Sequence, residues 1–301
     1  MGEKVALCIL NGIFKSIALL PLPVLYAISD FLYYITYYIA RYRRKVVRKN
    51  LLKSFPEKSE KEILDIEKKF YRHFTDYVVE TVKLLHISDE EMRRRMVFTN
   101  VCELEKVRGD GNPIFLYIGH YCNWEYIPSI TMWLKEGLEP CQVYHPLKNK
   151  VMDKFFLKLR SRFHSVSMSQ QQTLRVILTM LRSGKQPILG LIADQHPKKR
   201  DSKVWMRFLN QETALITGGE TMGRRMNAHF FYCHFKCTKR GYYEMTFTRI
   251  NPVESDEFSV TKQYMQMLEA NIKEAPQYWL WSHNRWKYKY SDIYPGETMP
   301  E

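Results

Sequence analysis

Cysteine is scarce in this sequence, and its placement excludes two kinds of small stabilised domain. The 301 residues contain 6 cysteines, which are scattered along the chain. A disulfide scaffold needs a dense set of cysteines in a short chain, so we expect none here. Cys233 and Cys237 form the only closely spaced pair, and no second pair completes the ligands of a structural zinc ion. The sequence therefore predicts no metal centre.

A hydrophobic run long enough to cross a membrane is also absent. The segment 5–40 is apolar, but it is interrupted by Lys15, Pro21, Pro23 and Asp30. Its longest uncharged run, Ser16–Ser29, has fourteen residues, whereas a spanning helix needs about 20. No cleavage motif of small residues follows, and Ala6 stands where a myristoylation signal needs Ser or Thr. Both absences argue against a cleaved leader and against that lipid anchor.

Acidic residues are too few to balance the basic ones, and the excess is unevenly placed. Lys+Arg 46 against Asp+Glu 32 gives a net charge of +14. The charges of the first forty residues sum to zero, so the whole excess lies beyond them. The next thirteen residues contain no acid and hold Arg41, Arg43, Arg44, Lys45, Arg48, Lys49 and Lys53. A neutral apolar segment followed by a basic run is typical of a membrane anchor with its cytoplasmic flank.

Three arrangements of this N-terminal segment remain open. It could form one tilted span that carries Lys15, a helical hairpin in one leaflet with its turn at Pro21–Pro23, or a buried hairpin of a soluble protein. Four tyrosines fall on adjacent helical turns, as membrane-interface residues do. They are Tyr33, Tyr34, Tyr37 and Tyr38. With the basic run, they favour a membrane anchor over residues 1–45, followed by a single domain over residues 46–301.

The rest of the chain alternates between helical and strand-like hydrophobic periods, and no linker or repeat divides it. Ser59 and Glu62 form a capping box that begins a helix over about 60–86. Further helices are expected over 123–135, 149–163, 170–182, 217–226 and 258–274. Strands are expected over 113–120, 141–145, 187–194, 229–237 and 242–250. This alternation predicts an α/β fold with a mostly parallel central sheet flanked by helices, and chemistry where strands end.

The strongest local motif lies at the end of the first expected strand, where His120 precedes Glu125 by five residues. Asn123 is a good N-cap, so Glu125 falls in the first helical turn, where an ionised carboxylate is favoured. We expect the turn to bring Glu125 back to the imidazole, which would leave the other ring nitrogen as a general base. The nucleophile would be a substrate hydroxyl or amine. Cys122 lies within the motif, but the sequence places no second histidine to serve a thiol nucleophile.

Four further blocks follow this motif in order. They are Asn149-x3-Asp153 with Arg160 and Arg162, Leu191-Ile-Ala-Asp194-Gln195, Phe208-Leu-Asn-Gln-Glu-Thr213-Ala214 leading to Thr217-Gly218 and Arg224-Arg225, and Pro276-Gln-Tyr-Trp-Leu-Trp281-Ser-His283-Asn-Arg285-Trp-Lys287. Together with His120-x4-Glu125 behind an apolar segment, they resemble the late lipid A acyltransferases of Gram-negative bacteria, within the lysophospholipid acyltransferase group. The resemblance covers about residues 10–290. Two positions depart from it: His145 follows Tyr144 where Arg is frequent, and His196 replaces a common second Asp.

The resemblance implies acyl transfer from an acyl carrier protein thioester to a hydroxyl of a lipid A precursor. His120 would be the general base, and Glu125 would stabilise its imidazolium form. Arg160, or backbone N–H groups near Gly119, would stabilise the oxyanion. The residues expected to bind substrate are Asn149, Asp153, Arg160, Arg162, Asp194 and Gln195. No metal or cofactor is needed, and the expected location is the bacterial inner membrane, among membrane lipids, with the active site facing the cytoplasm.

Several of these residues also have a purely structural interpretation. Arg160 could belong to a solvated helix face, Asp194 could only cap a loop, and Trp205, Phe208 and Trp281 could line an acyl channel or lie in the core. A basic stretch could bind sugar phosphates or the acidic carrier protein, or be an ordinary charged loop. It comprises Lys198, Lys199, Arg200, Lys203 and Arg207.

Two other functions compete with this one. An acyltransferase could act on an aminolipid or a lysophospholipid, although the Pro-rich block typical of lysophosphatidate enzymes is missing. A basic protein could also bind anionic lipid without catalysis. That would explain the net charge but not a His–Glu pair at a strand-to-helix turn. No nucleic-acid-binding motif is present, so nucleic acid is not an expected partner.

Overall fold

A computed structural model describes residues 12–144, 146 and 149–299 of the chain. From α2 onwards, the α-helices are α2 (Leu22–Tyr34), α3 (Arg44–Ser54), α4 (Glu60–Lys83), α5 (Asp89–Arg95), α6 (Cys102–Glu105), α7 (Lys150–Arg160), α8 (Thr173–Arg182), α9 (Gly218–Arg225) and α10 (Ser259–Glu274). Shorter 3₁₀ or π helices are η1 (Ile35–Ile39), η2 (Trp124–Met132), η3 (Ser161–Phe163), η4 (Lys199–Asp201), η5 (Pro276–Tyr278) and η6 (Tyr290–Asp292). The strands are β1 (Met96–Phe98), β2 (Ile114–Ile118), β3 (Leu138–Tyr144), β4 (Val166–Ser169), β5 (Gln186–Ile192), β6 (Trp205–Phe208), β7 (Gln211–Ala214), β8 (His229–Lys239) and β9 (Tyr242–Ile250).

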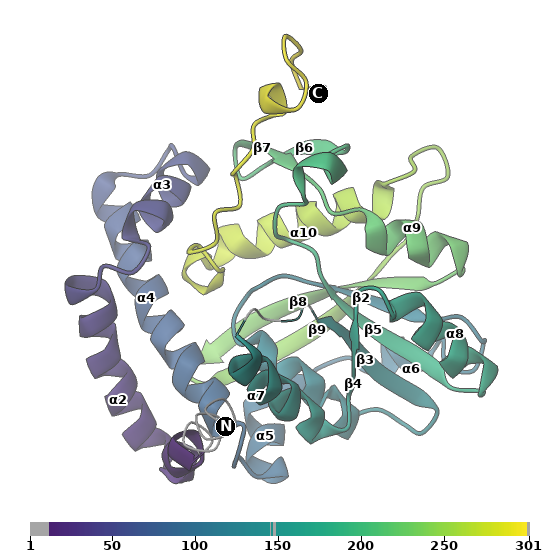
Figure 1. Cartoon of the computed structure of the whole chain (residues 1–301), viewed down its shortest axis with the longest axis horizontal. Coiled ribbons are helices and arrows are strands. Elements are labelled where there is room, and N and C mark those ends of the chain that lie inside the picture. Colours follow the sequence, from purple (N-terminus) through teal and green to yellow (C-terminus); the bar gives the residue numbers. More distant parts are fainter. Residues whose placement is uncertain (1–11, 145, 147–148, 300–301) are drawn as a thin grey trace.

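Seven strands form one sheet in the order β1-β9-β8-β2-β5-β3-β4. Every neighbouring pair is parallel except β8 and β9, which form an antiparallel hairpin. Strand β2 lies in the middle, between β5 and β8, and all of its residues are buried. Figure 1 shows helices on both sides of this sheet. The predicted α/β fold, a mostly parallel central sheet flanked by helices, is therefore confirmed.

Alternate residues of β2 serve the two faces of the sheet. The ring of Tyr117 packs against Tyr264 of α10, with centroids 5.0 Å apart, and its hydroxyl lies close to Gly219 of α9. Leu116 and Ile118 line a cavity on the opposite face, between the sheet, η2 and α7. Helices α9 and α10 thus pack against one face of β2, while the other face lines this cavity.

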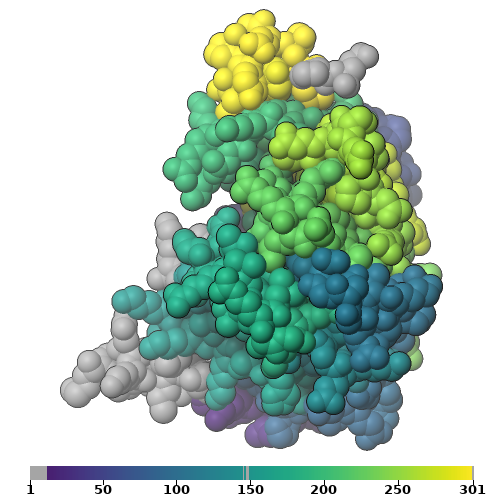
Figure 2. Space-filling view, turned by 90° about the vertical axis from the view of Figure 1, so that its right-hand side faces the viewer, coloured from purple at the N-terminus to yellow at the C-terminus, as the bar shows by residue number. Residues whose placement is uncertain are grey.

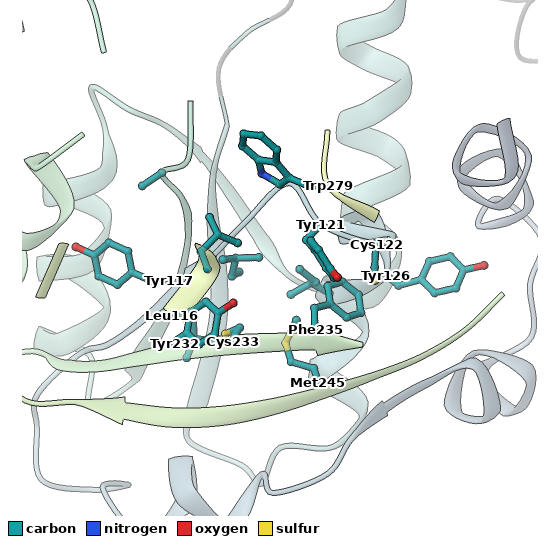
Figure 3. Packing of buried hydrophobic residues seen from close by; sticks show 14 of the residues in the cluster. Leu116, Tyr117, Tyr121, Cys122, Tyr126, Tyr232, Cys233, Phe235, Met245 and Trp279 are labelled. Atoms are coloured by element: carbon teal, nitrogen blue, oxygen red, sulfur yellow. The ribbon is translucent and has the colours of Figure 1, made fainter. Parts of the chain in front are cut away.

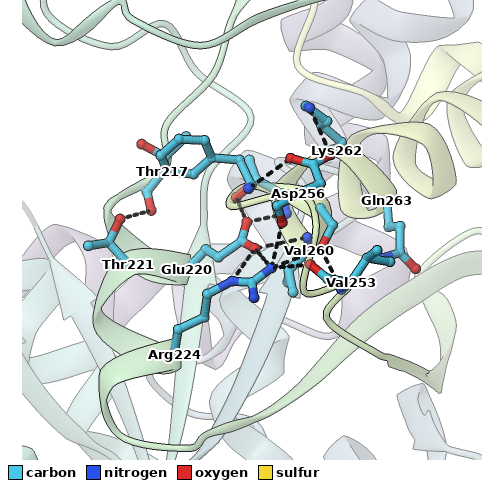
Figure 4. Close-up of polar contacts among 12 residues, drawn as sticks. Thr217, Glu220, Thr221, Arg224, Val253, Asp256, Val260, Lys262 and Gln263 are labelled. Atoms are coloured by element: carbon cyan, nitrogen blue, oxygen red, sulfur yellow. Dashed lines mark hydrogen bonds and ion pairs between the residues drawn. The ribbon is translucent and has the colours of Figure 1, made fainter.

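Helix α10 is fixed at its first turn by a fully buried carboxylate from α9 (Figure 4). Glu220 accepts hydrogen bonds from the backbone N–H of Thr261 at 2.7 Å and from Nε of Arg224 at 2.9 Å. A negative charge at this position stabilises a helix N-terminus. One turn further on, Oη of Tyr264 donates to the carbonyl of Ile118 at 2.9 Å. The helix therefore also fixes the end of β2.

The N-terminal segment forms two helices that meet at a sharp bend. The helix Gly12–Leu19 and the helix Leu22–Ile39, which comprises α2 and η1, are inclined by 117°. Pro21 precedes the second helix, so the bend lies where a hairpin turn was predicted. Among the described residues, no individual helix is long and apolar enough to cross a membrane. By length and composition alone, this bent pair is. Residues 1–11 of the predicted anchor lie outside the described residues.

Helix α2 packs along α4 with one face and exposes the other. Oγ of Ser29 donates to Asp76 at 2.6 Å, and Oη of Tyr26 donates to Glu80 at 3.0 Å. Large apolar side chains are exposed on the outer side of α2 and η1. They are Val24, Phe31, Tyr34, Tyr38 and Ile39. These helices therefore pack against the rest of the described chain on one side only. The predicted boundary at residue 45, between an anchor and a catalytic domain, stays a prediction.

Some local structure differs from the prediction. The helix expected over 123–135 is the 3₁₀ helix η2, because Pro128 within it lacks the N–H that an α-helical turn needs. The helix expected from residue 170 begins at Thr173, after the edge strand β4. A hairpin that was not predicted, β6–β7, packs against the C-terminal segment. The ring of Trp205 on β6 lies 5.4 Å from the ring of Tyr290. Figures 1 and 2 show this hairpin and the C-terminal segment together at one end of the molecule.

Candidate active site

Strand register brings two sequence motifs together. In the parallel pair of β2 and β5, Ile118 lies opposite Ile192. His120 and Asp194 each follow two residues later, so both side chains arrive at the same point of the carboxyl edge of the sheet. Nδ1 of the His120 imidazole lies 2.5 Å from Oδ1 of Asp194.

Asp194 is a buried carboxylate with several donors around it. Its Oδ2 accepts hydrogen bonds from the backbone N–H of His120 and from Nε1 of Trp279, both at 2.8 Å. Burial on its own would raise the pKa of Asp194, but the charge of His120 and these hydrogen bonds outweigh burial and lower the pKa to about 2. Asp194 is therefore ionised at neutral pH. Because an ionised carboxylate only accepts, the imidazole proton lies on Nδ1.

The second ring nitrogen of His120 lies on the more open side. The imidazole side chain is 18% exposed, and its Nε2 lies 3.3 Å from Nε2 of Gln195. With the proton on Nδ1, Nε2 carries a lone pair that can accept from this amide or from a substrate hydroxyl. The ring also meets Trp124 edge-on, with centroids 5.2 Å apart. The arrangement is that of a general base oriented by a carboxylate.

The closing segment of the chain completes this arrangement. Tyr121 and Trp279 form an isolated antiparallel bridge, and the backbone N–H of Cys122 donates to the carbonyl of Tyr278 at 2.9 Å. Figure 3 shows Trp279 and Tyr121 together above the paired strands β8 and β9. The pairing places the Trp279 indole on Asp194. The sequence singled out the closing block but not Trp279, because only tertiary pairing reveals where its indole points.

Glu125 occupies a different place from the one that the sequence predicted. Asn123 does cap the turn, since its Oδ1 accepts from the backbone N–H of Glu125 at 3.2 Å. The carboxylate, however, is bound by Arg160, whose Nε donates to Oε2 at 3.0 Å and whose Nη2 donates to Oε1 at 2.7 Å. The carboxylate on the imidazole is Asp194, so the expected contact between Glu125 and His120 is wrong. A buried Glu125 needs a counter-charge, and α7 supplies it.

The two predicted oxyanion donors differ in their availability. Nε and Nη2 of Arg160 bind Glu125, which leaves Nη1 as the third nitrogen of this guanidinium. The backbone N–H groups of residues 120–122 all donate to other protein atoms. In this conformation those N–H groups cannot also bind an oxyanion, so Arg160 is the better candidate.

The other residues expected to bind substrate are dispersed along α7 and its flanks. Asn149 is the N-cap of α7, and Asp153 in its first turn acts electrostatically on Arg160. Arg162 instead donates to backbone carbonyls of the segment between α4 and α5, so it holds α7 and η3 to that segment. His145, one of the two departures from the family pattern, lies outside the described residues.

An apolar cavity of about 80 Å³ adjoins the site. Trp124, Glu125 and Arg160 belong to its wall, and because Trp124 also contacts the imidazole, the cavity begins next to His120. The apolar part of the wall consists of Leu116, Ile118, Ile127, Pro128, Ile130, Pro140, Cys141, Val143, Ile188 and Ile192. These residues come from β2, β3, β5 and η2, so the central sheet forms one side of the cavity.

Burial decides two of the structural interpretations. Phe208 and Trp281 are fully buried, and the Phe208 ring lies 5.9 Å from Trp279, so both belong to the core rather than to this cavity wall. Cys122 is also fully buried, and burial raises the pKa of its thiol well above the ordinary value. A thiol held in this protonated form is a poor nucleophile.

Comparison with known proteins agrees with this geometry. A family model described as bacterial lipid A biosynthesis acyltransferase matches residues 4–288. The chain belongs to this family. The resemblance that the sequence motifs predicted is thereby confirmed, and with it the reaction class, acyl transfer, and lipid A as the type of molecule concerned.

Two relatives within the lipid A acyltransferases are similar along most of their length. The chain is 19% identical over 243 residues to the lipid A biosynthesis acyltransferase of Haemophilus influenzae, covering 80% of this chain and 75% of that protein. It is 24% identical over 281 residues to the lipid A biosynthesis lauroyltransferase of Escherichia coli K12, covering 92% of this chain and 89% of that protein. The family match, which covers residues 4–288, includes both the described N-terminal helices and the sheet.

Proposed function

We propose that this lipid A acyltransferase moves a fatty acyl chain from an acyl carrier protein thioester to a hydroxyl of a lipid A precursor. The main support is the His120–Asp194 pair, in which a buried ionised carboxylate holds Nδ1 and leaves Nε2 for a substrate proton. The adjoining cavity has a mostly apolar wall, which is the kind of surface that an acyl chain contacts. The wall of this cavity includes the guanidinium of Arg160 and also Trp124, whose ring contacts the imidazole.

Each step of the proposed reaction has a group to perform it. As the acceptor oxygen attacks the thioester carbonyl carbon, its proton passes to Nε2 of His120, and Asp194 stabilises the imidazolium. Nη1 of Arg160 stabilises the negative oxygen of the tetrahedral intermediate, with Glu125 holding the guanidinium. When the C–S bond breaks, the imidazolium returns the proton to the departing thiolate. The ester and the carrier thiol are released, and no metal or cofactor takes part.

The enzyme would act at the cytoplasmic face of the bacterial inner membrane, with the outer side of α2 and η1 against the lipid. The exposed apolar residues of that side support this orientation. Only part of the predicted basic run is free for lipid headgroups, because Arg44 and Arg48 pair with the buried Glu67. Three exposed lysines spaced four residues apart remain on one face of α3: Lys45, Lys49 and Lys53.

The carrier protein would dock on the basic stretch 198–207. This stretch begins three residues after Gln195, which contacts the catalytic imidazole. Its five cationic side chains are all exposed, so their charge is available to an acidic partner. A carrier bound there would bring its thioester to the end of β5, where His120 and Asp194 lie.

Mass spectrometry of acyl transfer tests the proposal directly. Purified protein is given acyl carrier protein charged with C12 to C16 chains and a lipid A precursor. We expect a mass gain of one acyl chain with the wild type and with His86→Ala, which removes an exposed histidine from the segment that follows α4. Folded His120→Ala is expected to give no product. Product from His120→Ala at the wild-type rate would overturn the role of the base.

Parallel reactions distinguish the competing functions. Acyl-coenzyme A replaces the carrier thioester in one set of reactions. Product with acyl-coenzyme A but not with the acyl carrier protein would overturn the carrier protein as donor. An aminolipid and a lysophospholipid replace the lipid A precursor in another set, and product only with these would overturn the acceptor while keeping acyl transfer. Binding of anionic lipid without product from any acceptor would favour the non-catalytic alternative.

A further inference from the structure

A second buried carboxylate connects the N-terminal helices to the active-site turn. Glu80 of α4 is fully buried. Its Oε1 accepts from Oη of Tyr26 at 3.0 Å, and its Oε2 accepts from Nδ2 of Asn123 and from Oη of Tyr243, both at 2.8 Å. Tyr26 lies on α2, Tyr243 on β9, and Asn123 immediately before η2. One carboxylate therefore joins α2, α4, β9 and the turn that follows the catalytic histidine.

Glu80 determines which way the amide of Asn123 points. In its ionised form the Glu80 carboxylate only accepts hydrogen bonds, so it binds the Nδ2 end of the Asn123 amide and turns Oδ1 towards the backbone N–H of Glu125. With the amide reversed, Nδ2 would face that N–H, donor against donor, and the cap would be lost. Glu125 in turn holds Arg160 at the cavity wall. The orientation of one amide thus sets the start of the turn that carries Glu125, and through Glu125 it affects Arg160 on α7.

We propose that Glu80 is a positioning residue for acyl transfer, which fixes the Glu125 turn through Asn123 and ties it to helix α2 through Tyr26. It acts through these neighbours and touches no reacting atom. This inference rests on the proposed function, because it concerns the same site.

The energetics of Glu80 support a role beyond packing. Burial is the main cause that raises the pKa of Glu80 to about 7. A carboxylate in this position destabilises the fold relative to an apolar side chain of similar size, which would fill the space without losing hydration. The specific orientation of Asn123 is what the carboxylate provides and an apolar side chain would not.

Glu80→Gln tests the proposal with little change in size. The new amide both donates and accepts, so Asn123 can adopt both orientations. We expect kcat in the acyl-transfer assay to fall about fivefold to tenfold, the size of a lost helix cap, with KM for the acceptor within about twofold. Glu220→Gln is the matched control, because Glu220 is also fully buried and caps α10 (Figure 4). Its folded form is expected to keep kcat within about twofold of wild type.

A double-mutant cycle separates positioning from general loosening. Asn123→Ala removes the amide, and we expect kcat to fall at least as far as in Glu80→Gln. In the Asn123→Ala background, Glu80→Gln should lower kcat by less than about twofold more, because the amide that it orients is gone. Additive losses, or a wild-type kcat in folded Glu80→Gln, would overturn the inference. Turnover retained by His120→Ala in the same assay would instead overturn the proposed mechanism and leave the result of the cycle intact.

Hydrogen exchange gives a readout that needs no turnover. The backbone N–H of Glu125 is protected by the Asn123 cap, so peptides that contain it should exchange faster in Glu80→Gln than in wild type. The same peptides should be unchanged in Glu220→Gln. Equal exchange in Glu80→Gln and wild type would overturn the inference even if no acyl acceptor gives product.

Discussion

The direction of a single hydrogen bond sets the chemistry of His120. Asp194 accepts from Nδ1, so the lone pair lies on Nε2, the nitrogen on the more exposed side of the ring. In the other tautomer, Nε2 would present an N–H to a hydroxyl that has to lose its own proton. In the proposed reaction, Asp194 would therefore set the tautomer of His120 as well as stabilise its charge.

We expect Asp194→Asn to lower kcat by at least about a hundredfold with little change in KM. An asparagine amide can donate to Nδ1, which moves the imidazole proton to Nε2 and removes the base. Nε1 of Trp279 can still donate to the remaining oxygen, so the fold should persist. Steady-state acyl transfer and circular dichroism check both statements. A folded variant within tenfold of the wild-type rate would contradict the assignment of Asp194.

Glu80 predicts a pH dependence of stability. Burial first, and the nearby Asp76 as well, raise the pKa of Glu80 from 4.5 to about 7. Because the folded-state pKa is raised, the stabilising contribution of this group is present below about pH 4.5 and is lost as pH rises through 7. Above pH 7 the ionised group costs roughly 3 kcal/mol relative to the unfolded chain.

Glu80→Gln removes this dependence. The free energy of unfolding of the variant, relative to wild type, is therefore expected to increase between about pH 4.5 and pH 7. Urea denaturation at several pH values measures the difference. A difference that stays constant across this range would show that Glu80 does not titrate as its burial implies.

At the scale of elements, the end of β2 is held at close range by α10. A Cβ on Gly119 would lie 2.6 Å from Cδ1 of Leu268, so an alanine here requires the buried Leu268 side chain to move. Gly190 on the neighbouring β5 is different, because its added Cβ would meet Ile118 at an ordinary 3.5 Å. The two glycines form a matched pair for measuring this contact.

We expect Gly119→Ala to lower the free energy of unfolding by about 1–3 kcal/mol through overpacking, and Gly190→Ala to change it by less. In a Leu268→Ala background the cost of Gly119→Ala should largely disappear, because the obstructing methyl group is gone. Chemical denaturation of the four variants supplies the comparison. Equal costs in both backgrounds would mean that Leu268 does not limit this spacing.

The elements also explain which parts of the site were predictable from the sequence. The alternation of hydrophobic periods is local, so it located β2, β5 and the position of His120 at a strand end. The partner of His120 depends on the register of β2 against β5, which is non-local, and the local motif therefore predicted Glu125 on the imidazole where the structure has Asp194. Pro128 inside an expected helix was visible in the sequence and accounts for the 3₁₀ form of η2. Glu80 carried no signal, because its partners come from three distant segments.

At the scale of the whole molecule, α2 and η1 expose apolar side chains, and α3 exposes basic ones. The apolar side chains include Phe31 and Ile39, which are 65% and 76% exposed, and the basic face consists of the three lysines of α3. A surface of this composition binds anionic lipid both by burial of apolar groups and by charge. The charge component should weaken with added salt, and the apolar component should not.

We expect replacement of Lys45, Lys49 and Lys53 by Gln to weaken binding of the full chain to vesicles that contain anionic lipid. The loss should be about 1 kcal/mol per lysine at low salt. The control replaces three exposed lysines on other elements by Gln, and it should bind as wild type does. The control lysines are Lys61, Lys106 and Lys236. Vesicle sedimentation at two salt concentrations measures both proteins, and equal losses would contradict a role for this face.

The central position of β2 has a consequence for biosynthesis. Ile114 begins the strand, and its partners on either side are Ile188 and His229. A ribosome that has just released β2 has yet to translate both neighbours, so this fully apolar strand waits with two unpaired edges. Trp279, which binds Asp194, is translated later still. A nascent chain therefore lacks the contact between Trp279 and Asp194 until nearly its whole length has been made, and both edges of β2 stay unpaired until β5 and β8 have been translated.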